Sequence, residues 1–263
     1  METTATDVVD LFCASRGTRE RLEEWKRDPR RRQVAPAVLA HTTRVLYRLT
    51  EGDVRAVCQR TEHALGQVRR EVGESVPEIV DWHPDFAFTH VFHICVERLG
   101  ALPTYQQFRE FAFSDEKGAV MLGEPAKLIV RSLVAERGVD EGRARSAMRW
   151  RVGNAYYGFL REVYTLVQLR CRGVHLQVHP LADALFRVDA WTGRRALSLR
   201  VANRKFRQGM NAGRKTPAEQ LLADVQPPLR FETIELAAAT TFGQVHVPTA
   251  KELDRAAVRL SRL

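Results

Sequence analysis

One segment in the C-terminal half of the chain combines the residue types that bind phosphate. The stretch NRKFRQGMNAGRK, residues 203–215, carries five basic side chains around one aromatic ring and two glycines. Its basic residues are Arg204, Lys205, Arg207, Arg214 and Lys215. Basic side chains neutralise phosphates, glycine lets the backbone approach them closely, and a ring such as Phe206 stacks on an exposed base. The segment therefore predicts nucleic-acid contact. The alternative is a basic loop that touches acidic residues of a protein partner.

The charges of the chain are unevenly distributed. The formal net charge is +9, from 41 Lys and Arg against 32 Asp and Glu. Residues 1–140 hold 20 basic and 22 acidic residues, whereas the following 123 residues hold 21 basic and 10 acidic ones. An excess of positive charge on one part of a chain is typical of a surface that neutralises phosphates. An arginine-rich composition is the alternative, but it does not explain the difference between the two parts.

Most of the chain before residue 140 is expected to be helical, because its apolar residues recur every three or four positions. The predicted helices are residues 8–27, 37–49, 53–72, 86–99, 104–113 and 125–136. Residues 86–113 have the pattern of a helix-turn-helix, whose second helix offers Gln106, Gln107, Arg109 and Glu110 to a DNA groove. The same pattern fits plain helix packing or partner binding. We expect residues 1–140 to form an all-α domain for partner docking.

From Arg143 onward the pattern changes to mixed helix and strand. A helix over residues 143–170 precedes three predicted strands, VHLQV (174–178), ALFRVDAW (184–191) and ALSLRVAN (196–203). A tight turn at residues 192–195 joins the last two. The segment TPAE, residues 216–219, predicts a capped helix start that could face phosphate. A strand at residues 229–236 and a helix at 249–259 follow, so the chain is predicted to be α+β overall.

This order of elements resembles the PD-(D/E)XK (restriction-endonuclease-like) nuclease superfamily. The resemblance covers residues 154–205 closely and the rest of residues 143–263 loosely, and it implies a restriction-endonuclease-like α/β domain. In that family an Asp and a second acid bind a divalent metal, a Lys two residues further on positions the attacking water, and a helix Glu often assists. Phosphodiester hydrolysis needs Mg²⁺, or Mn²⁺ in its place, to stabilise developing charge and to activate the water.

The resemblance assigns roles to two acids. Asp189, at the end of the predicted strand FRVDAW, takes the position of the motif Asp, and Glu162, in GFLREVY, that of the helix Glu. Both would be catalytic residues and metal ligands. Other interpretations are that Asp189 caps the turn before Trp191 and that Glu162 pairs with a neighbouring arginine.

The other two motif positions depart from the family pattern. They fall on Arg200 and Ala202, where the family has an acid and a lysine. An arginine repels Mg²⁺, and alanine has no group that orients water. Three explanations stay open: the site binds DNA without cutting it, Lys205 supplies the missing catalytic lysine, or an alanine has been substituted for a lysine at position 202. In a site without catalysis, Arg200 would join the basic residues of the following segment as a phosphate clamp.

These observations predict a DNA-binding component of a DNA-processing system such as phage defence, restriction or transposition. Its nuclease-like domain would be a magnesium-dependent DNA endonuclease or a catalytically impaired form of one. Two alternatives are a non-catalytic nucleic-acid-binding assembly subunit and a helix-turn-helix transcriptional regulator. Other protein subunits are expected as partners of the helical domain. The sequence lacks a run of about 18 apolar residues, and its first residues are acidic where a secretory signal is basic. We therefore expect a cytoplasmic protein without membrane contact.

Overall fold

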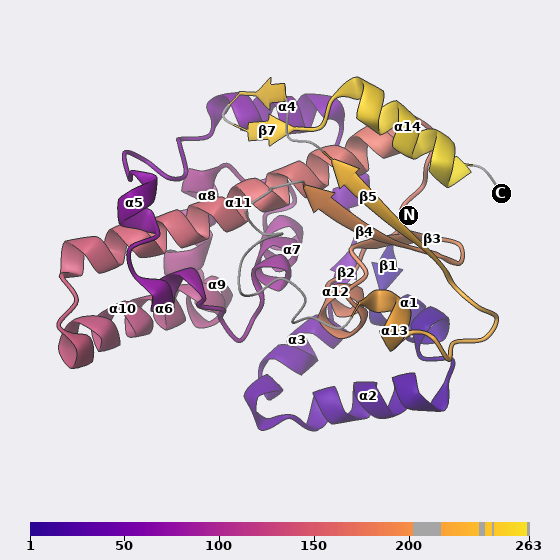
Figure 1. The fold of residues 1–263 in the computed structure, drawn as a ribbon, viewed down its shortest axis with the longest axis horizontal. Coiled ribbons are helices and arrows are strands. Elements are labelled where there is room, and N and C mark those ends of the chain that lie inside the picture. The colour runs from indigo at the N-terminus through magenta and orange to yellow at the C-terminus, as the bar shows by residue number, and fades with distance from the viewer. Residues whose placement is uncertain (202–216, 237–239, 244, 262–263) are drawn as a thin grey trace. The chain divides into compact units, whose positions relative to one another are not determined.

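The protein is mostly helical, with short strands gathered in small sheets (Figure 1). Its structure is a computed structural model that describes residues 1–201, 217–236, 240–243 and 245–261. This mixture of helices and sheets is the α+β class expected from the sequence. Within the described residues, no helix is both long enough and apolar enough to cross a membrane.

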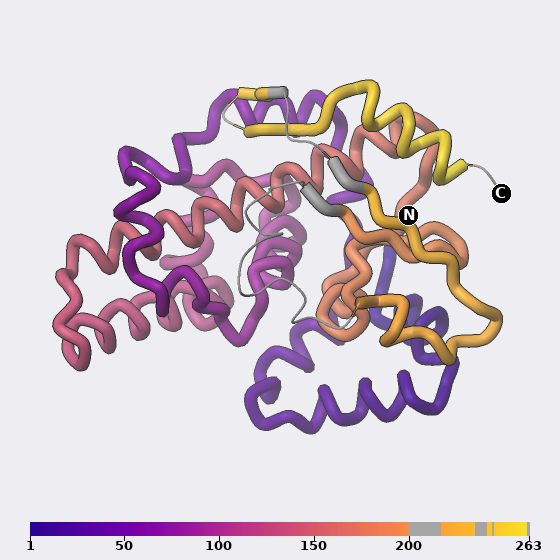
Figure 2. Tube along the Cα trace, viewed as in Figure 1, coloured from indigo at the N-terminus to yellow at the C-terminus, as the bar shows by residue number. Residues whose placement is uncertain are grey.

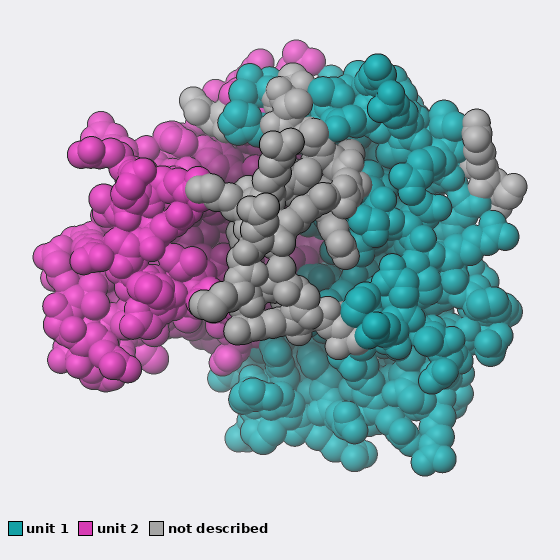
Figure 3. Space-filling model, viewed as in Figure 1, with its two compact units in different colours: residues 1–51, 162–241, 246–263 teal, residues 52–161, 242–245 magenta. Residues whose placement is uncertain are grey.

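The chain divides into two compact units, which are coloured separately in Figure 3. Unit 1 comprises residues 1–51, 162–241 and 246–263, and unit 2 comprises residues 52–161 and 242–245. One boundary falls inside the long helix α11 (Glu141–Cys171) rather than near residue 140. Counted by unit, unit 1 holds 26 basic and 17 acidic residues and unit 2 holds 15 of each. The net positive charge therefore belongs to unit 1, including its N-terminal residues.

The N-terminal part of unit 1 alternates short helices with two very short strands. Its elements are β1 (Thr3–Thr4), α1 (Ala5–Phe12), α2 (Arg16–Arg27), η1 (Pro29–Arg31), α3 (Val34–Leu39), β2 (Thr42–Thr43) and η2 (Val45–Tyr47). The helix expected over residues 8–27 is two helices, because the Ser15 hydroxyl accepts a hydrogen bond from the Thr18 amide at 3.2 Å and starts α2 there. The helix expected over residues 37–49 stops early, since β2 pairs antiparallel with β1.

The chain after α11 forms a three-stranded sheet and helices. Its elements are α12 (Pro180–Phe186), β3 (Ala190–Thr192), β4 (Arg195–Val201), α13 (Ala218–Leu221), β5 (Arg230–Leu236), β6 (Thr240–Phe242), β7 (Val245–Val247) and α14 (Ala250–Ser261). The sheet order is β3-β4-β5, with β3 antiparallel and β5 parallel to β4. A glycine at the left-handed φ of 52°, Gly193, makes the predicted turn between β3 and β4. The strand predicted at residues 174–178 is reduced to a single antiparallel bridge from Gln177 to Trp191.

Most of another predicted strand is a helix. The sequence predicts a strand over residues 184–191, but α12 occupies the first part of this range. Pro180 lies in the first turn of α12, where a backbone N–H has no helical partner in any case. The neighbouring His179 caps the helix, because its Nδ1 accepts a hydrogen bond from the Leu181 amide at 3.1 Å. These local signals outweigh the alternating pattern that follows them, and only β3 remains as a strand.

Residues near the N-terminus of unit 1 pack against residues that lie much later in the sequence, in and around its sheet. The ring of Phe12 lies 5.7 Å from the ring of Phe186 and 5.5 Å from that of Trp191, centre to centre. All three side chains are almost completely buried. The Tyr47 hydroxyl accepts a hydrogen bond from the Val178 amide at 2.9 Å, across 131 positions of sequence. In Figure 2 the indigo N-terminal trace accordingly runs beside the salmon and orange trace of α12 and β3.

A buried arginine connects the sheet to the last helix of unit 1. The Arg195 guanidinium donates hydrogen bonds to the carbonyls of Arg259 at 3.1 Å and Leu260 at 2.9 Å. These carbonyls belong to the last turn of α14, where helical partners are missing and a positive charge is favoured. The start of β4 is thereby held against the end of α14.

Unit 2 is built from helices around stacked aromatic rings. Before α11 it contains α4 (Glu51–Arg60, whose first residue belongs to unit 1), α5 (Arg70–Gly73), α6 (Pro77–Val80), α7 (Phe88–Leu99), α8 (Tyr105–Ser114), α9 (Glu116–Gly118), η3 (Ala119–Gly123) and α10 (Glu124–Arg137). The Phe92 ring stacks on Phe108 at 4.4 Å and on Phe159 at 4.7 Å. The helix expected over residues 53–72 is interrupted, but α7, α8 and α10 lie where the sequence predicts them.

Candidate functional site

The two acids proposed as metal ligands act on each other electrostatically in unit 1. Glu162 lies in α11, and Asp189 immediately precedes β3. Glu162 keeps some accessible surface, yet burial of its carboxyl group raises its pKa well above the usual range. The negative charges of Asp189 and then of Asp183 raise this pKa further. The fold therefore brings Asp183 and Asp189 within electrostatic range of Glu162, although they are separated from it in the sequence.

The backbone of the sheet holds the Asp189 carboxylate in place. Asp189 comes immediately before β3, whereas the sequence suggested that it ends a strand. Its amide donates to the Leu197 carbonyl at 3.0 Å, although Ala190 is the ladder partner of Leu197. The Leu197 carbonyl therefore holds the backbone of Asp189 at the end of the ladder between β3 and β4. The Asp189 Oδ2 then accepts a hydrogen bond from the Leu199 amide at 2.6 Å.

A third acid of this cluster, Asp183, did not enter the sequence prediction. It lies in the first turn of α12, the helix that replaces most of a predicted strand. The His-Pro pair at positions 179 and 180 was the local signal for this helix, because proline favours a first turn. Even with that signal, the proximity of Asp183 to Glu162 depends on the packing of α12 and α11. This packing cannot be predicted from the sequence pattern.

The carboxylates suit part of a site for a hard divalent cation. Mg²⁺ prefers oxygen ligands and is commonly held by one or two carboxylates, with water and substrate phosphates completing its coordination. The mutual repulsion that raises the pKa of Glu162 is a repulsion that a bound cation would relieve. Within the residues that the structure describes, no group of three or more His, Cys, Asp or Glu side chains is arranged to hold a metal ion. Glu162 and Asp189 therefore fit two ligands of such a site and not a complete protein cage.

The remaining predicted residues fall at or beyond the limit of the described chain. Arg200 lies in β4, with its backbone paired to Glu235 of β5. The motif position Ala202 lies outside the described residues. The residues after it that were predicted to assist catalysis or to bind DNA also lie outside them, namely Arg204, Lys205, Arg207, Arg214 and Lys215. The helix start expected at Thr216 is capped instead at Pro217, without a side-chain hydrogen bond, and Thr216 lies outside the described residues as well.

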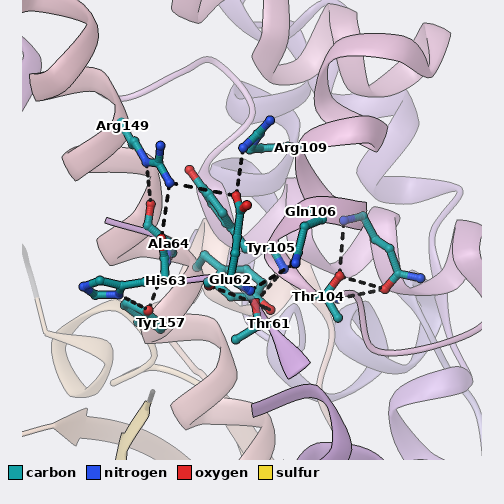
Figure 4. Close-up of polar contacts among 12 residues, drawn as sticks. Thr61, Glu62, His63, Ala64, Thr104, Tyr105, Gln106, Arg109, Arg149 and Tyr157 are labelled. Carbon is teal, nitrogen blue, oxygen red and sulfur yellow. Dashed lines mark hydrogen bonds and ion pairs between the residues drawn. The ribbon is translucent and has the colours of Figure 1, made fainter. Parts of the chain in front are cut away.

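The helix-turn-helix segment of unit 2 uses most of its polar side chains internally. Helices α7 and α8 are joined through Gly100, whose φ of 68° is left-handed. Figure 4 shows Gln106 accepting a hydrogen bond from the Glu62 amide at 3.1 Å, and Arg109 paired with the Glu62 carboxylate at 2.8 Å. Gln107 closes the capping box at the start of α8. Three of the four side chains expected to face a DNA groove thus have partners within unit 2.

Comparison with known proteins adds no assignment. No protein-family model matches the chain, and no match was found among curated proteins or among solved structures. The function of the protein is therefore inferred from the residues of this chain and their arrangement.

Proposed function

We propose that unit 1 is a nuclease-like, DNA-binding module in which Glu162 and Asp189 are ligands for Mg²⁺ or Mn²⁺. The observation that carries this proposal is the electrostatic coupling of the two carboxylates, which the resemblance to PD-(D/E)XK nucleases singled out as the helix Glu and the motif Asp. Glu162 and Asp189 are both half-buried, and two negative charges in such a location repel each other unless a proton or a cation neutralises one of them.

Part of the order of elements in unit 1 supports the same proposal. After α11 come the bridge at Gln177, helix α12, the antiparallel pair β3 and β4, helix α13, the parallel strand β5, strands β6 and β7 and helix α14. The hairpin, the parallel strand and the closing helix agree with the order on which the resemblance rests, whereas α12, β6 and β7 are additions to it. The net charge of +9 in unit 1 suits a partner that is a polyanion.

In the proposed site each residue has a limited task. The Leu199 amide orients the Asp189 carboxylate, and Glu162 adds the second ligand from α11. A bound Mg²⁺ would stabilise charge on the scissile phosphate and lower the pKa of the attacking water. Lys205 is proposed to assist that water, and basic residues are proposed to clamp phosphates of the DNA. These clamping residues are Arg200, Arg204, Lys205, Arg207, Arg214 and Lys215.

Cleavage assays separate an active nuclease from an impaired one. Supercoiled, linear and branched DNA are incubated with Mg²⁺ or Mn²⁺ and with the wild type, Ala202→Lys and Asp189→Ala. Cleavage by the wild type or by Ala202→Lys supports catalysis, provided that Asp189→Ala does not cleave. The matched control is Asp224→Ala, an exposed acid of the same unit that is expected to leave cleavage unchanged. If no version cuts and Asp189→Ala leaves DNA binding unaltered, the metal-site proposal fails.

Salt-dependent binding tests the DNA clamp separately from cleavage. The triple substitution of Arg204, Lys205 and Arg207 by alanine is expected to reduce affinity for duplex DNA by about a hundred-fold, roughly 2.7 kcal/mol. The slope of log affinity against log salt should become shallower by about 2 to 3, since each lost phosphate contact removes about 0.9. Replacing Arg69 and Arg70, exposed arginines of unit 2, is the control. An equal loss in the control would contradict the assignment of DNA binding to unit 1.

A further inference from the structure

Unit 2 contains a cavity that the proposed nuclease-like site does not use. Its volume is about 800 Å³, a size typical of small-molecule sites, and it lies among α8, η3, α10 and α11. Apolar side chains form much of its surface, including those of Phe108, Leu122, Val130, Met148 and Val152. Several of these side chains are otherwise buried in the core of unit 2. The cavity therefore offers an apolar floor to a ligand.

Positive charge predominates around this apolar floor. The basic residues that line the cavity are Arg109, Lys127, Arg131, Arg145 and Arg149, and one acid, Glu141, lines it as well. Arg145 pairs with Glu141 at 2.6 Å, and Lys127 pairs with Glu124 at 2.6 Å. These exposed pairs are weak and open readily to a competing anion. Unit 2 as a whole has no net charge, whereas the cavity lining contains five basic residues and one acid.

Two of these arginines form a preoriented pair at one carboxylate. Arg109 lies 2.8 Å from Glu62 Oε1, and Arg149 lies 3.9 Å from the same oxygen. Arg149 also donates to the backbone carbonyls of Ala64 at 3.2 Å and His63 at 3.3 Å. Figure 4 shows both guanidinium groups directed at Glu62. Their side chains remain 49% and 40% exposed, so two fixed positive charges share one negative charge and stay accessible to a ligand.

The loop that carries Glu62 is itself held firmly in unit 2. The Ala64 amide donates to the Tyr157 hydroxyl at 3.0 Å, and the Tyr105 amide donates to the Thr61 hydroxyl at 2.9 Å. A Cβ atom at Gly153 would lie 2.9 Å from the Ala64 carbonyl oxygen, so only glycine lets α11 approach the loop this closely. The arginine pair therefore does not have to be ordered when a ligand binds, which lowers the entropic cost of binding.

A buried phenol adds no negative charge to this end of the cavity. Tyr105 lines the cavity and is almost fully buried. Burial raises the pKa of Tyr105 to about 12, although the charges of Arg149 and Arg109 oppose this rise. The phenol therefore stays protonated at neutral pH, and the local field remains positive.

We infer that the cavity of unit 2 binds a small organic anion with an apolar body. The body lies on the floor around Phe108 and Met148, and the anionic group lies against Arg109 and Arg149. Guanidinium groups in a fixed pair suit the planar or tetrahedral oxygens of carboxylate, sulfonate or phosphate. A nucleotide and an acyl anion share this chemistry. The inference does not depend on the metal site of unit 1, and a failure of either leaves the other standing.

Fluorescence titration with anilinonaphthalene sulfonate tests this inference, because the dye has an aromatic body and one anionic group. We expect saturable binding to the folded protein at one site. Arg131→Glu, an exposed change on the rim, should weaken binding about ten-fold, and Arg109→Gln should do the same. Arg70→Gln is the matched control, since Arg70 forms an exposed pair with Glu74 away from the cavity lining and should leave binding unchanged. Circular dichroism confirms that each variant is folded.

Two competitors identify the source of the anion. Displacement of the dye by adenosine monophosphate points to a nucleotide, and displacement by laurate points to an acyl anion. A bulky side chain in the cavity, Val152→Trp, should block the dye and both competitors. The inference is overturned if the dye does not bind, if Arg131→Glu and Val152→Trp both bind it as the wild type does, or if neither competitor displaces it.

Discussion

The two units of this protein carry their functional groups in different ways. Unit 1 is assembled from three separate stretches of chain, carries the net charge of +9, and gathers half-buried acids beside a small sheet. Unit 2 is drawn almost wholly from one stretch, has equal numbers of acids and bases, and arranges arginines around an apolar cavity. A large positive charge suits a long polyanion, whereas a local pair of arginines above an apolar floor suits a small one. Net charge and local arrangement therefore point to different ligands.

The largest effect expected from this comparison concerns the discontinuous core of unit 1. Phe12→Ala removes a fully buried ring from its contacts with Phe186 and Trp191 and should lower the free energy of unfolding by about 3–5 kcal/mol. Hydrogen exchange is expected to quicken in β3 and β4 and to stay slow in α8. Phe108→Ala in unit 2 is the matched change, with the reverse pattern. Uniform loss of protection by either variant would show that the two units do not unfold separately.

A moderate loss of folding stability is expected at acid pH, because protonation of the buried His179 disfavours the folded state. Its Nδ1 accepts from the Leu181 amide, and its Nε2 donates to the His41 carbonyl at 3.1 Å, so the neutral ring satisfies both bonds. Burial lowers the pKa of His179 below its usual value, although Asp7 and the His41 carbonyl oppose this. The unfolded chain then binds the proton more readily, and stability should fall as pH drops below about 6.5.

Chemical denaturation at several pH values measures this dependence. His179→Asn keeps a capping acceptor but does not titrate, so it should flatten the acid limb of the stability curve. Loss of the bond to His41 should lower stability at neutral pH by about 1–3 kcal/mol. The exposed His175→Asn is the control and should change neither property. An unchanged acid limb in His179→Asn would assign the acid sensitivity to other groups.

The smallest expected change in folding stability concerns the acid cluster of Glu162, Asp183 and Asp189. The raised pKa of Glu162 favours the folded state at low pH, and this contribution is lost as pH rises through the raised value. Glu162→Gln removes the buried charge, so the variant should be more stable than the wild type at neutral pH but not at acid pH. The midpoint of thermal unfolding should rise by about 2–4 °C for each kcal/mol gained.

Unfolding measured with added Mg²⁺ tests whether the acid cluster binds a metal ion. The ion should stabilise the wild type and have less effect on Glu162→Gln, because one proposed ligand is missing. Glu219→Gln, at an exposed position of unit 1, should behave as the wild type with and without the ion. Equal stabilisation of all three proteins by Mg²⁺ would separate the acid cluster from metal binding.

Sequence patterns predicted several of the helices, one turn and the candidate acids. The periodicity of apolar residues located α7, α8, α10 and α11, because a helix buries one face and repeats that face every three or four residues. The turn at Gly193 followed from the need for a left-handed residue between paired strands. Glu162 and Asp189 emerged as candidates because few acids occur in a basic part of the chain and these two matched the family motif.

Contacts between residues far apart in the sequence determine which of these segments lie together within each unit. The union of residues 1–51 with the C-terminal sheet depends on Phe12 and Tyr47 meeting partners far along the chain, and single side chains carry no periodic signal. The participation of Asp183 and the raised pKa of Glu162 depend likewise on how helices pack. The pairing of Arg109 and Arg149 at Glu62 joins three segments in the same way. Local structure follows from repeated short-range preferences, whereas a site is made by contacts between residues that the sequence leaves far apart.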